Sequence, residues 1–203
     1  MADLHENEYL TIKHATESLF KDKGSKFLAY AIPFEDDSLL KETLEPIKKE
    51  HYNARHFCFA YRINPENIAE RANDDGEPGH TAGTPILGQI HSLNLVNVLV
   101  VVVRYFGGTK LGVSGLINAY KTAAKEALEN ATIVKKEIES DVKIAFDYAD
   151  MNEVMRVIKK EEPRIINQNM NLRVEMTLRM RKDKIIDFSS QLELLKSITF
   201  IAI

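Results

Sequence analysis

Residues 96–120 read VNVLVVVVRYFGGTKLGVSGLINAY, and this stretch is the most informative about the fold. Its first part, residues 96–103, is so uniformly apolar and β-branched that it predicts a central strand buried on both faces. Behind the glycines, apolar side chains recur at helical spacing and predict a helix of about four turns. These side chains are Val113, Leu116, Ile117, Tyr120, Ala123, Ala124, Ala127 and Leu128. A buried strand that runs through a glycine-rich turn into a helix indicates an α+β domain.

The residues before this stretch supply the rest of that domain. Alternating apolar patterns predict strands, and 3.6-residue periodicity predicts helices. The expected strands cover residues 8–14, 25–34 and 54–63, and the expected helices cover about 38–50 and 82–92. In the third strand, His56, Cys58 and Ala60 face one way, and Phe57, Phe59 and Tyr61 face the other. We therefore expect a first α+β domain over residues 1–135.

The residues after 135 follow a different order of elements. The expected strands cover residues 138–148, 163–170, 172–181 and 197–203, and the expected helices cover residues 151–161 and 184–195. In the first of these strands Val142, Ile144, Phe146 and Tyr148 share one face. The order β-α-β-β-α-β is that of a ferredoxin-like domain. We expect this second domain over residues 136–203.

Composition limits the classes of function. The 203 residues are 44% hydrophobic, which is enough for a real core, and they carry 27 basic and 30 acidic side chains. The net charge of −3 provides no whole-chain attraction to nucleic acid or membrane, so any such contact has to be local. A lone Cys58 excludes an internal disulfide and fits a reducing compartment. With no apolar run long enough to span a bilayer and no signal-peptide pattern, we expect a soluble cytoplasmic protein without a membrane partner.

The first candidate site is the stretch NDDGEPGHTAGTPIL at residues 73–87. Asp74, Asp75 and Glu77 place three carboxylates within four residues, the density that a magnesium site or a general acid/base pair requires. The alternative is an acidic, solvated turn in which the aspartates bond to their own backbone and the prolines stiffen the path. We favour the turn, because the sequence identifies no distant ligand, and predict no metal and no cofactor.

The second candidate site is RYFGGTKLGVSG at residues 104–115. Backbone N–H groups at a strand-to-helix junction, together with Lys110, can hold an anion such as a phosphate. The glycine spacing matches neither a Walker A motif nor GxGxxG, so the expected phosphate belongs to an RNA backbone rather than to a nucleotide. The alternative is that the glycines only provide positive φ values and close helix packing.

Two side chains of the third strand permit an enzymatic alternative. His56 and Cys58 face the same way and can ligate a metal or form a thiol–imidazole pair with a group such as His80. With residues 74–77 they define a metal-dependent hydrolase as the alternative function. Half-buried packing is the more frequent role of such residues, so we assign no catalytic residue and favour a protein that is not an enzyme.

The second domain offers a weaker candidate surface. Arg173, Arg179, Arg181 and Lys182 form a possible RNA-contact stripe on its sheet. Its outward positions carry no aromatic side chain on which a base can stack, so the domain is not an RNA-recognition motif of the usual kind. A solvated charged face is the alternative interpretation.

Four strings carry a resemblance. They are GSKF at 24–27, ARHFCFAY at 54–61, NDDGEPGHTAGTPIL at 73–87 and VVRYFGGTKLGVSGLINAY at 102–120. In order and spacing they resemble the IMPACT/YigZ family, over nearly the whole chain. The resemblance implies a ribosomal-protein-like N-terminal domain and a C-terminal domain similar to the fifth domain of elongation factor G. Its eukaryotic member is a translational regulator, which implies a non-catalytic factor that contacts the ribosome, RNA or a translation-associated protein, with no DNA specificity.

The chain departs from the family pattern at a few positions. They are Asn73, Gly79, His80, Val113 and Ser114. The candidate binding residues lie in and beside the two glycine-rich strings, which we expect to be neighbours in space. They are Arg55, His56, Asp74, Asp75, Glu77, Thr81, Gly83, Arg104, Tyr105, Gly107, Gly108, Lys110 and Gly112.

Overall fold

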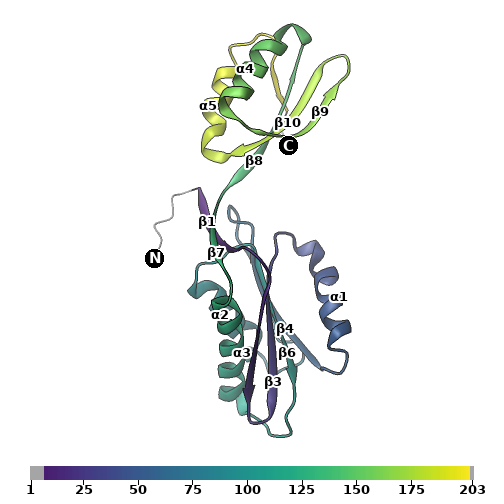
Figure 1. The fold of residues 1–203 in the computed structure, drawn as a ribbon, viewed down its shortest axis with the longest axis vertical. Helices are drawn as coiled ribbons and strands as arrows, with labels where there is room; N and C mark the ends of the chain where they lie inside the picture. The colour runs from purple at the N-terminus through teal and green to yellow at the C-terminus, as the bar shows by residue number, and fades with distance from the viewer. Residues whose placement is uncertain (1–6, 202–203) are drawn as a thin grey trace. The chain divides into compact units, whose positions relative to one another are not determined.

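A computed structural model describes residues 7–201 of the chain, which form a mixed α+β protein, as predicted (Figure 1). The chain divides into two compact units. Among the described residues, the N-terminal unit comprises residues 9–136, and the C-terminal unit comprises residues 137–201 with residues 7–8. None of the described helices is both long enough and apolar enough to span a bilayer.

The N-terminal unit is built on a five-stranded antiparallel sheet with the order β2-β3-β6-β4-β5. The strands are β2 (Thr16–Asp22), β3 (Ser25–Pro33), β6 (Val98–Tyr105), β4 (His56–Ile63) and β5 (Ala69–Asn73). The apolar run forms the central strand β6, and its residues 98–103 are completely buried. This confirms the prediction, because only a strand covered on both faces accommodates six consecutive large apolar side chains.

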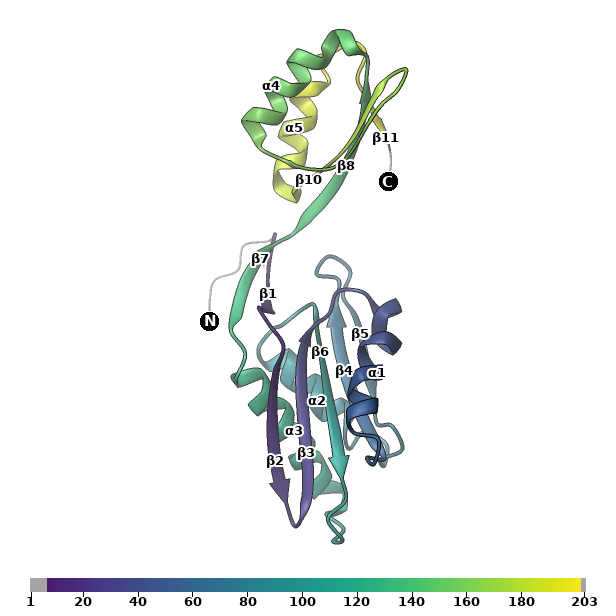
Figure 2. The same cartoon turned by 45° about the vertical axis from the view of Figure 1, so that its right-hand side comes forward.

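Helices cover both faces of this sheet (Figures 1 and 2). The helices α2 (Gly83–Ser92) and α3 (Gly112–Glu129) lie on one face, and α1 (Leu40–Glu50) lies on the other. Under α2 and α3 the strands present small side chains such as Ala29 and Ala60, whereas under α1 they present aromatic ones such as Phe57 and Phe59. Small residues let the two helices approach the sheet closely.

Several expected positions need correction. Val113 and Ile117, which we expected on the buried face of α3, are 59% and 37% exposed because they lie at the margins of its apolar stripe. The first expected strand ends earlier, since β1 covers Glu8–Ile12. It forms a two-stranded sheet with β7 (Ile133–Glu137), a strand that we did not expect.

The C-terminal unit has the ferredoxin-like arrangement that the sequence predicted. Its elements are β8 (Glu139–Phe146), α4 (Met151–Glu161), β9 (Arg164–Met170), β10 (Val174–Arg181), α5 (Ile185–Leu192) and β11 (Thr199–Ile201). The sheet order β11-β8-β10-β9 is antiparallel throughout. Val142, Ile144 and Phe146 are buried as expected, whereas Tyr148 is half exposed because β8 ends before it. Residues 202–203 of the last expected strand lie outside the described residues.

Candidate functional site

The two glycine-rich segments meet at one end of the N-terminal sheet. We call residues 74–82 the acidic loop and residues 106–111 the glycine loop. The acidic loop connects β5 to α2, and the glycine loop connects β6 to α3. The two loops are close because β4 and β6 are antiparallel neighbours, with His56 at the start of β4 opposite Arg104 near the end of β6.

A buried ion pair joins the acidic loop to the end of β6, directly before the glycine loop. The guanidinium Nη1 of Arg104 donates to Oε1 of Glu77 at 2.6 Å, and the two side chains are only 8% and 4% exposed. The hydroxyl of Tyr120, on α3, donates to the same carboxylate oxygen at 2.8 Å. The guanidinium also lies 5.6 Å from the ring centroid of Phe27 and 5.7 Å from that of Phe106. One carboxylate therefore fixes the acidic loop to both β6 and α3.

Asp74 caps the helix that follows the acidic loop. Its Oδ1 accepts hydrogen bonds from the backbone N–H of Ala82 and of Gly83, at 2.9 and 2.8 Å, and its Oδ2 accepts one from the N–H of His80 at 2.8 Å. Burial alone would raise the pKa of the Asp74 carboxyl, but these three donors outweigh it and hold the pKa below its usual value. Asp74 thus satisfies donors that the start of α2 leaves free.

The other acidic-loop contacts fix the loop to β4. The Oδ2 of Asp75 accepts a hydrogen bond from the backbone N–H of Phe57 at 2.6 Å. His56 donates from Nδ1 to the carbonyl oxygen of Asp75 at 2.9 Å. The thiol of Cys58 donates to the carbonyl oxygen of Asp74 at 3.0 Å. Asp74, Asp75 and Glu77 all accept internal hydrogen bonds, so the geometry resembles the structural turn, not a catalytic carboxylate cluster.

The geometry gives the hydrolase alternative no support. Cys58 is completely buried, and this burial raises the pKa of its thiol far above the ordinary value. A catalytic cysteine requires the opposite shift. Nδ1 of His56 donates to a carbonyl oxygen, so no thiol–imidazole pair forms through that atom. Within residues 7–201, no group of three or more His, Cys, Asp or Glu side chains has the arrangement of a metal site.

Close backbone packing fixes the glycine loop. The N–H of Gly107 donates to Oγ of Ser25 at 3.1 Å. A Cβ atom added to Gly107 would lie 1.9 Å from the carbonyl carbon of Gly24, so no other residue fits there. Gly108 and Gly112 have φ values of +87° and +75°. The glycines thus have the conformational role that we considered, and the loop still exposes Phe106, at 60%, and Lys110.

The remaining predicted residues divide between the interior and the surface. Thr81 is buried, with its hydroxyl donating to the carbonyl of Pro78 at 2.6 Å. Tyr105 points to the opposite sheet face, where its hydroxyl lies 2.9 Å from Nδ1 of His51. Arg55 is exposed. Gly83 packs closely against the backbone of β5, because a Cβ atom added to it would lie 2.5 Å from the backbone N of Asn73.

Two residues of this region are absent from our predicted set. Tyr120 was predicted only as part of the helical apolar face, yet its hydroxyl reaches both Glu77 and Cys58. A tyrosine among alanines on a buried face is the signal for such a role, because a buried phenol requires a hydrogen-bond partner. Ser25 lies in the string GSKF, but the sequence did not indicate its contact with Gly107, because the two residues are 82 positions apart.

The arginines of the C-terminal unit lie beside carboxylates. Arg173 pairs with Asp147 at 2.8 Å. Arg179 forms a two-point contact with Asp141 at 2.5 and 2.8 Å, and the side-chain hydrogen bond with Arg179 lowers the pKa of Asp141. Arg181 pairs with Glu137 and Asp183, at 2.6 and 2.7 Å. Lys182 lies in the short 3₁₀ turn before α5. The positive charge of these three arginines is therefore compensated locally.

Comparison with known proteins shows the class to which this fold and site belong. Residues 23–128, which include both loops, match the Impact N-terminal domain. The chain is 32% identical over 190 residues to an IMPACT family member of Haemophilus influenzae, covering 91% of each protein. It is 28% identical to the IMPACT family member YigZ of Escherichia coli, covering 84% of each. The chain is also similar to the crystal structure of a hypothetical protein. The two chains are 26% identical, and they superimpose over 98% of each with a TM-score of 0.78. The chain belongs to the IMPACT family.

Proposed function

We propose that the protein is a non-catalytic factor that acts on translation in the cytoplasm and contacts ribosomal RNA through the joined loops. The observation that supports this most strongly is the buried pair of Arg104 and Glu77. This pair fixes the acidic loop to the end of β6 in the interior, while residues 106–110 of the glycine loop remain exposed at the surface. A buried pair of this kind is weak evidence for stability but is well suited to fixing one geometry.

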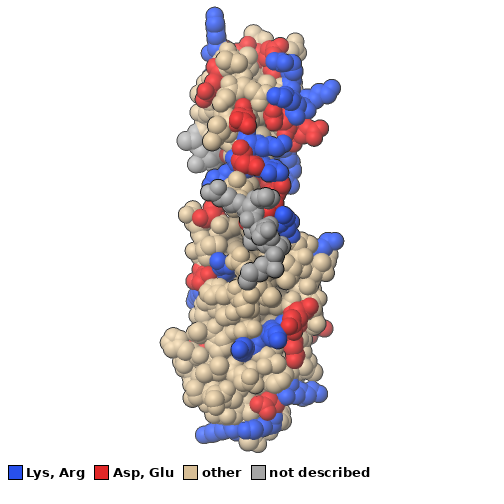
Figure 3. All heavy atoms as spheres, turned by 90° about the vertical axis from the view of Figure 1, so that its left-hand side faces the viewer, with Lys and Arg blue, Asp and Glu red and all other residues tan. Residues whose placement is uncertain are grey.

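The exposed groups of the glycine loop have the chemistry of a phosphate-binding surface. Lys110 provides an exposed positive charge, and the exposed backbone of Gly107 and Gly108 lets a phosphate approach closely. The ring of Phe106, 60% exposed, is available for stacking on an unpaired base. Figure 3 shows basic side chains at the lower end of the N-terminal unit. Since the whole chain carries a net charge of −3, this attraction is local.

Co-sedimentation with ribosomes at graded salt tests the proposal. We expect Lys110→Glu to weaken association about tenfold at moderate salt and to leave the melting temperature nearly unchanged, because it alters an exposed phosphate contact. Lys125→Glu is the matched control. Lys125 is also exposed, but it lies on α3, about 20 Å along the helix axis from Gly112. Association that responds neither to salt nor to Lys110→Glu would reject an RNA contact by this loop.

A further inference from the structure

A groove of about 560 Å³ lies on the sheet face opposite the joined loops, in the N-terminal unit. It runs between α1 and the strands β4 and β5. Its floor consists of Leu40, Leu44 and Phe59, which present apolar surface to the groove. The two leucines are one helical turn apart on α1, so they line the same side of it. The groove exists because a single helix covers this face and leaves the edge of the sheet open.

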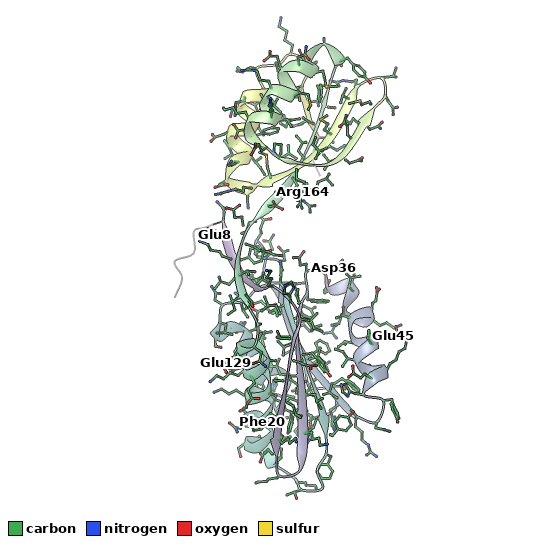
Figure 4. All side chains as sticks on the ribbon, viewed as in Figure 1. Glu8, Phe20, Asp36, Glu45, Glu129 and Arg164 are labelled. Carbon is green, nitrogen blue, oxygen red and sulfur yellow. The ribbon has the colours of Figure 1, made fainter. Side chains whose placement is uncertain are left out.

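Positively charged side chains surround this apolar floor. They are Lys41, Lys48 and Lys49 of α1 and Arg71 of β5. Lys48 lies 5.6 Å from the ring centroid of Phe57, and Arg71 lies 5.7 Å from that of Phe59. The one acidic side chain of the lining is Glu45, which pairs with Lys49 at 2.7 Å and is labelled on α1 in Figure 4. The lining is therefore strongly positive although the whole chain is negative.

An exposed aromatic side chain completes the groove. Tyr52, two residues after the end of α1, lines the groove and is 78% exposed. Tyrosine and arginine beside an apolar floor are the residue types that most often anchor a bound protein. An exposed tyrosine loses little conformational entropy on binding, because it has only two side-chain torsions.

We propose that this groove binds an acidic amphipathic segment of a partner protein. The segment would place apolar side chains spaced three and four residues apart on the floor, and its flanking carboxylates would meet the lysines and Arg71. The volume suits a few large apolar side chains. RNA fits less well, because Leu40 and Leu44 offer no stacking surface, Arg71 covers the ring of Phe59, and Tyr52 is the one exposed ring of the lining. This proposal does not depend on the glycine loop, because none of residues 106–111 lines the groove.

Selection from a random displayed peptide library tests this without knowledge of the partner. The full chain is the target, and we expect the enriched peptides to combine Asp or Glu with Leu, Ile or Phe at helical spacing. The enriched consensus peptide is then synthesised with a fluorophore, and its binding is measured by anisotropy. The variants are Lys48→Glu combined with Arg71→Glu, and separately Tyr52→Ala. Lys125→Glu, on the other side of the sheet, is the matched control.

The expected result is that the double charge reversal weakens binding of the consensus peptide about tenfold or more, while the control variant binds normally. Tyr52→Ala should weaken it as well with no change in melting temperature, since the ring is exposed. Enrichment of basic or uncharged peptides would overturn the proposal, as would binding that ignores all the groove variants. If instead a labelled oligouridine RNA binds the chain and loses affinity in the groove variants, the surface is a nucleic-acid site and the proposal is wrong.

Discussion

Glu77 and Arg104 are 27 residues apart in the sequence, yet their side chains form a 2.6 Å ion pair that is more than nine-tenths buried. Because Tyr120 donates to the same carboxylate, the pair connects the acidic loop to β6 and α3. The pairing of β4 with β6 places the two glycine-rich segments side by side, and this contact fixes the acidic loop in that place.

Removal of one partner of this pair should destabilise the protein strongly. We expect Glu77→Ala to lower the free energy of unfolding by about 3–5 kcal/mol, because it leaves the Arg104 charge buried without its counter-ion. Urea denaturation measures this. The double variant Glu77→Leu with Arg104→Met removes both charges and should recover much of the loss, whereas a double variant as unstable as the single one would show that the charge is not the cause.

Asp74 should make the stability of the fold depend on acid pH. Its carboxyl has a lowered pKa in the folded protein, so the ionised form favours folding. This contribution is present above about pH 4, the unfolded pKa, and is lost as the pH falls through the folded pKa. We expect Asp74→Asn to lower the unfolding free energy by about 1.5–3 kcal/mol at neutral pH, and by less in acid. Equal losses at both pH values would contradict the capping role.

Gly107 should tolerate no side chain. An added Cβ would lie 1.9 Å from the carbonyl carbon of Gly24, so Gly107→Ala has to displace the glycine loop from the start of β3. We expect a loss of about 3 kcal/mol or more, at the upper end of overpacking effects. Gly79→Ala in the acidic loop is the control, because nothing lies within 4 Å of its added Cβ. Thermal unfolding of the two variants gives the comparison, and similar melting temperatures would contradict this packing.

The thiol of Cys58 should be unreactive in the folded protein. Burial raises its pKa, so almost no thiolate exists near neutral pH. We expect iodoacetamide to label the native chain only at the rate of unfolding and to label the denatured chain readily. Fast labelling of the folded protein, with a rate that rises near neutral pH, would indicate an activated thiol and would restore the hydrolase alternative.

The sequence predicted those elements whose burial pattern is strong. The apolar run of β6 and the helical spacing of α3 each indicate one structure, and both elements form as expected. The strands β2 and β5 escaped prediction for a physical reason. β5 is a short, mostly exposed edge strand with the sequence AERAN, which has no alternation to detect. In β2 the polar Thr16 and Ser18 face α3, where they donate to the carbonyls of Ala127 and Ala123.

The candidate site was only partly predictable. Glycines and carboxylates marked the right segments, because the backbone there needs special conformations and its N–H groups need partners. The sequence could not show that Asp74 caps a helix that begins at Gly83, or that Glu77 pairs with Arg104. Both contacts depend on how the strands place the loops. Arg173, directly before β10, and Arg179 and Arg181 within it illustrate the same limit, because each pairs with a carboxylate of another segment.

Crosslinking of the chain to ribosomes by ultraviolet light tests whether the joined loops contact ribosomal RNA. The peptides that carry nucleotides are then mapped by mass spectrometry. We predict adducts on the glycine loop, at Phe106 and Lys110, and their loss in Lys110→Glu. Adducts confined to the C-terminal unit, or crosslinks that persist unchanged in that variant, would contradict the claim.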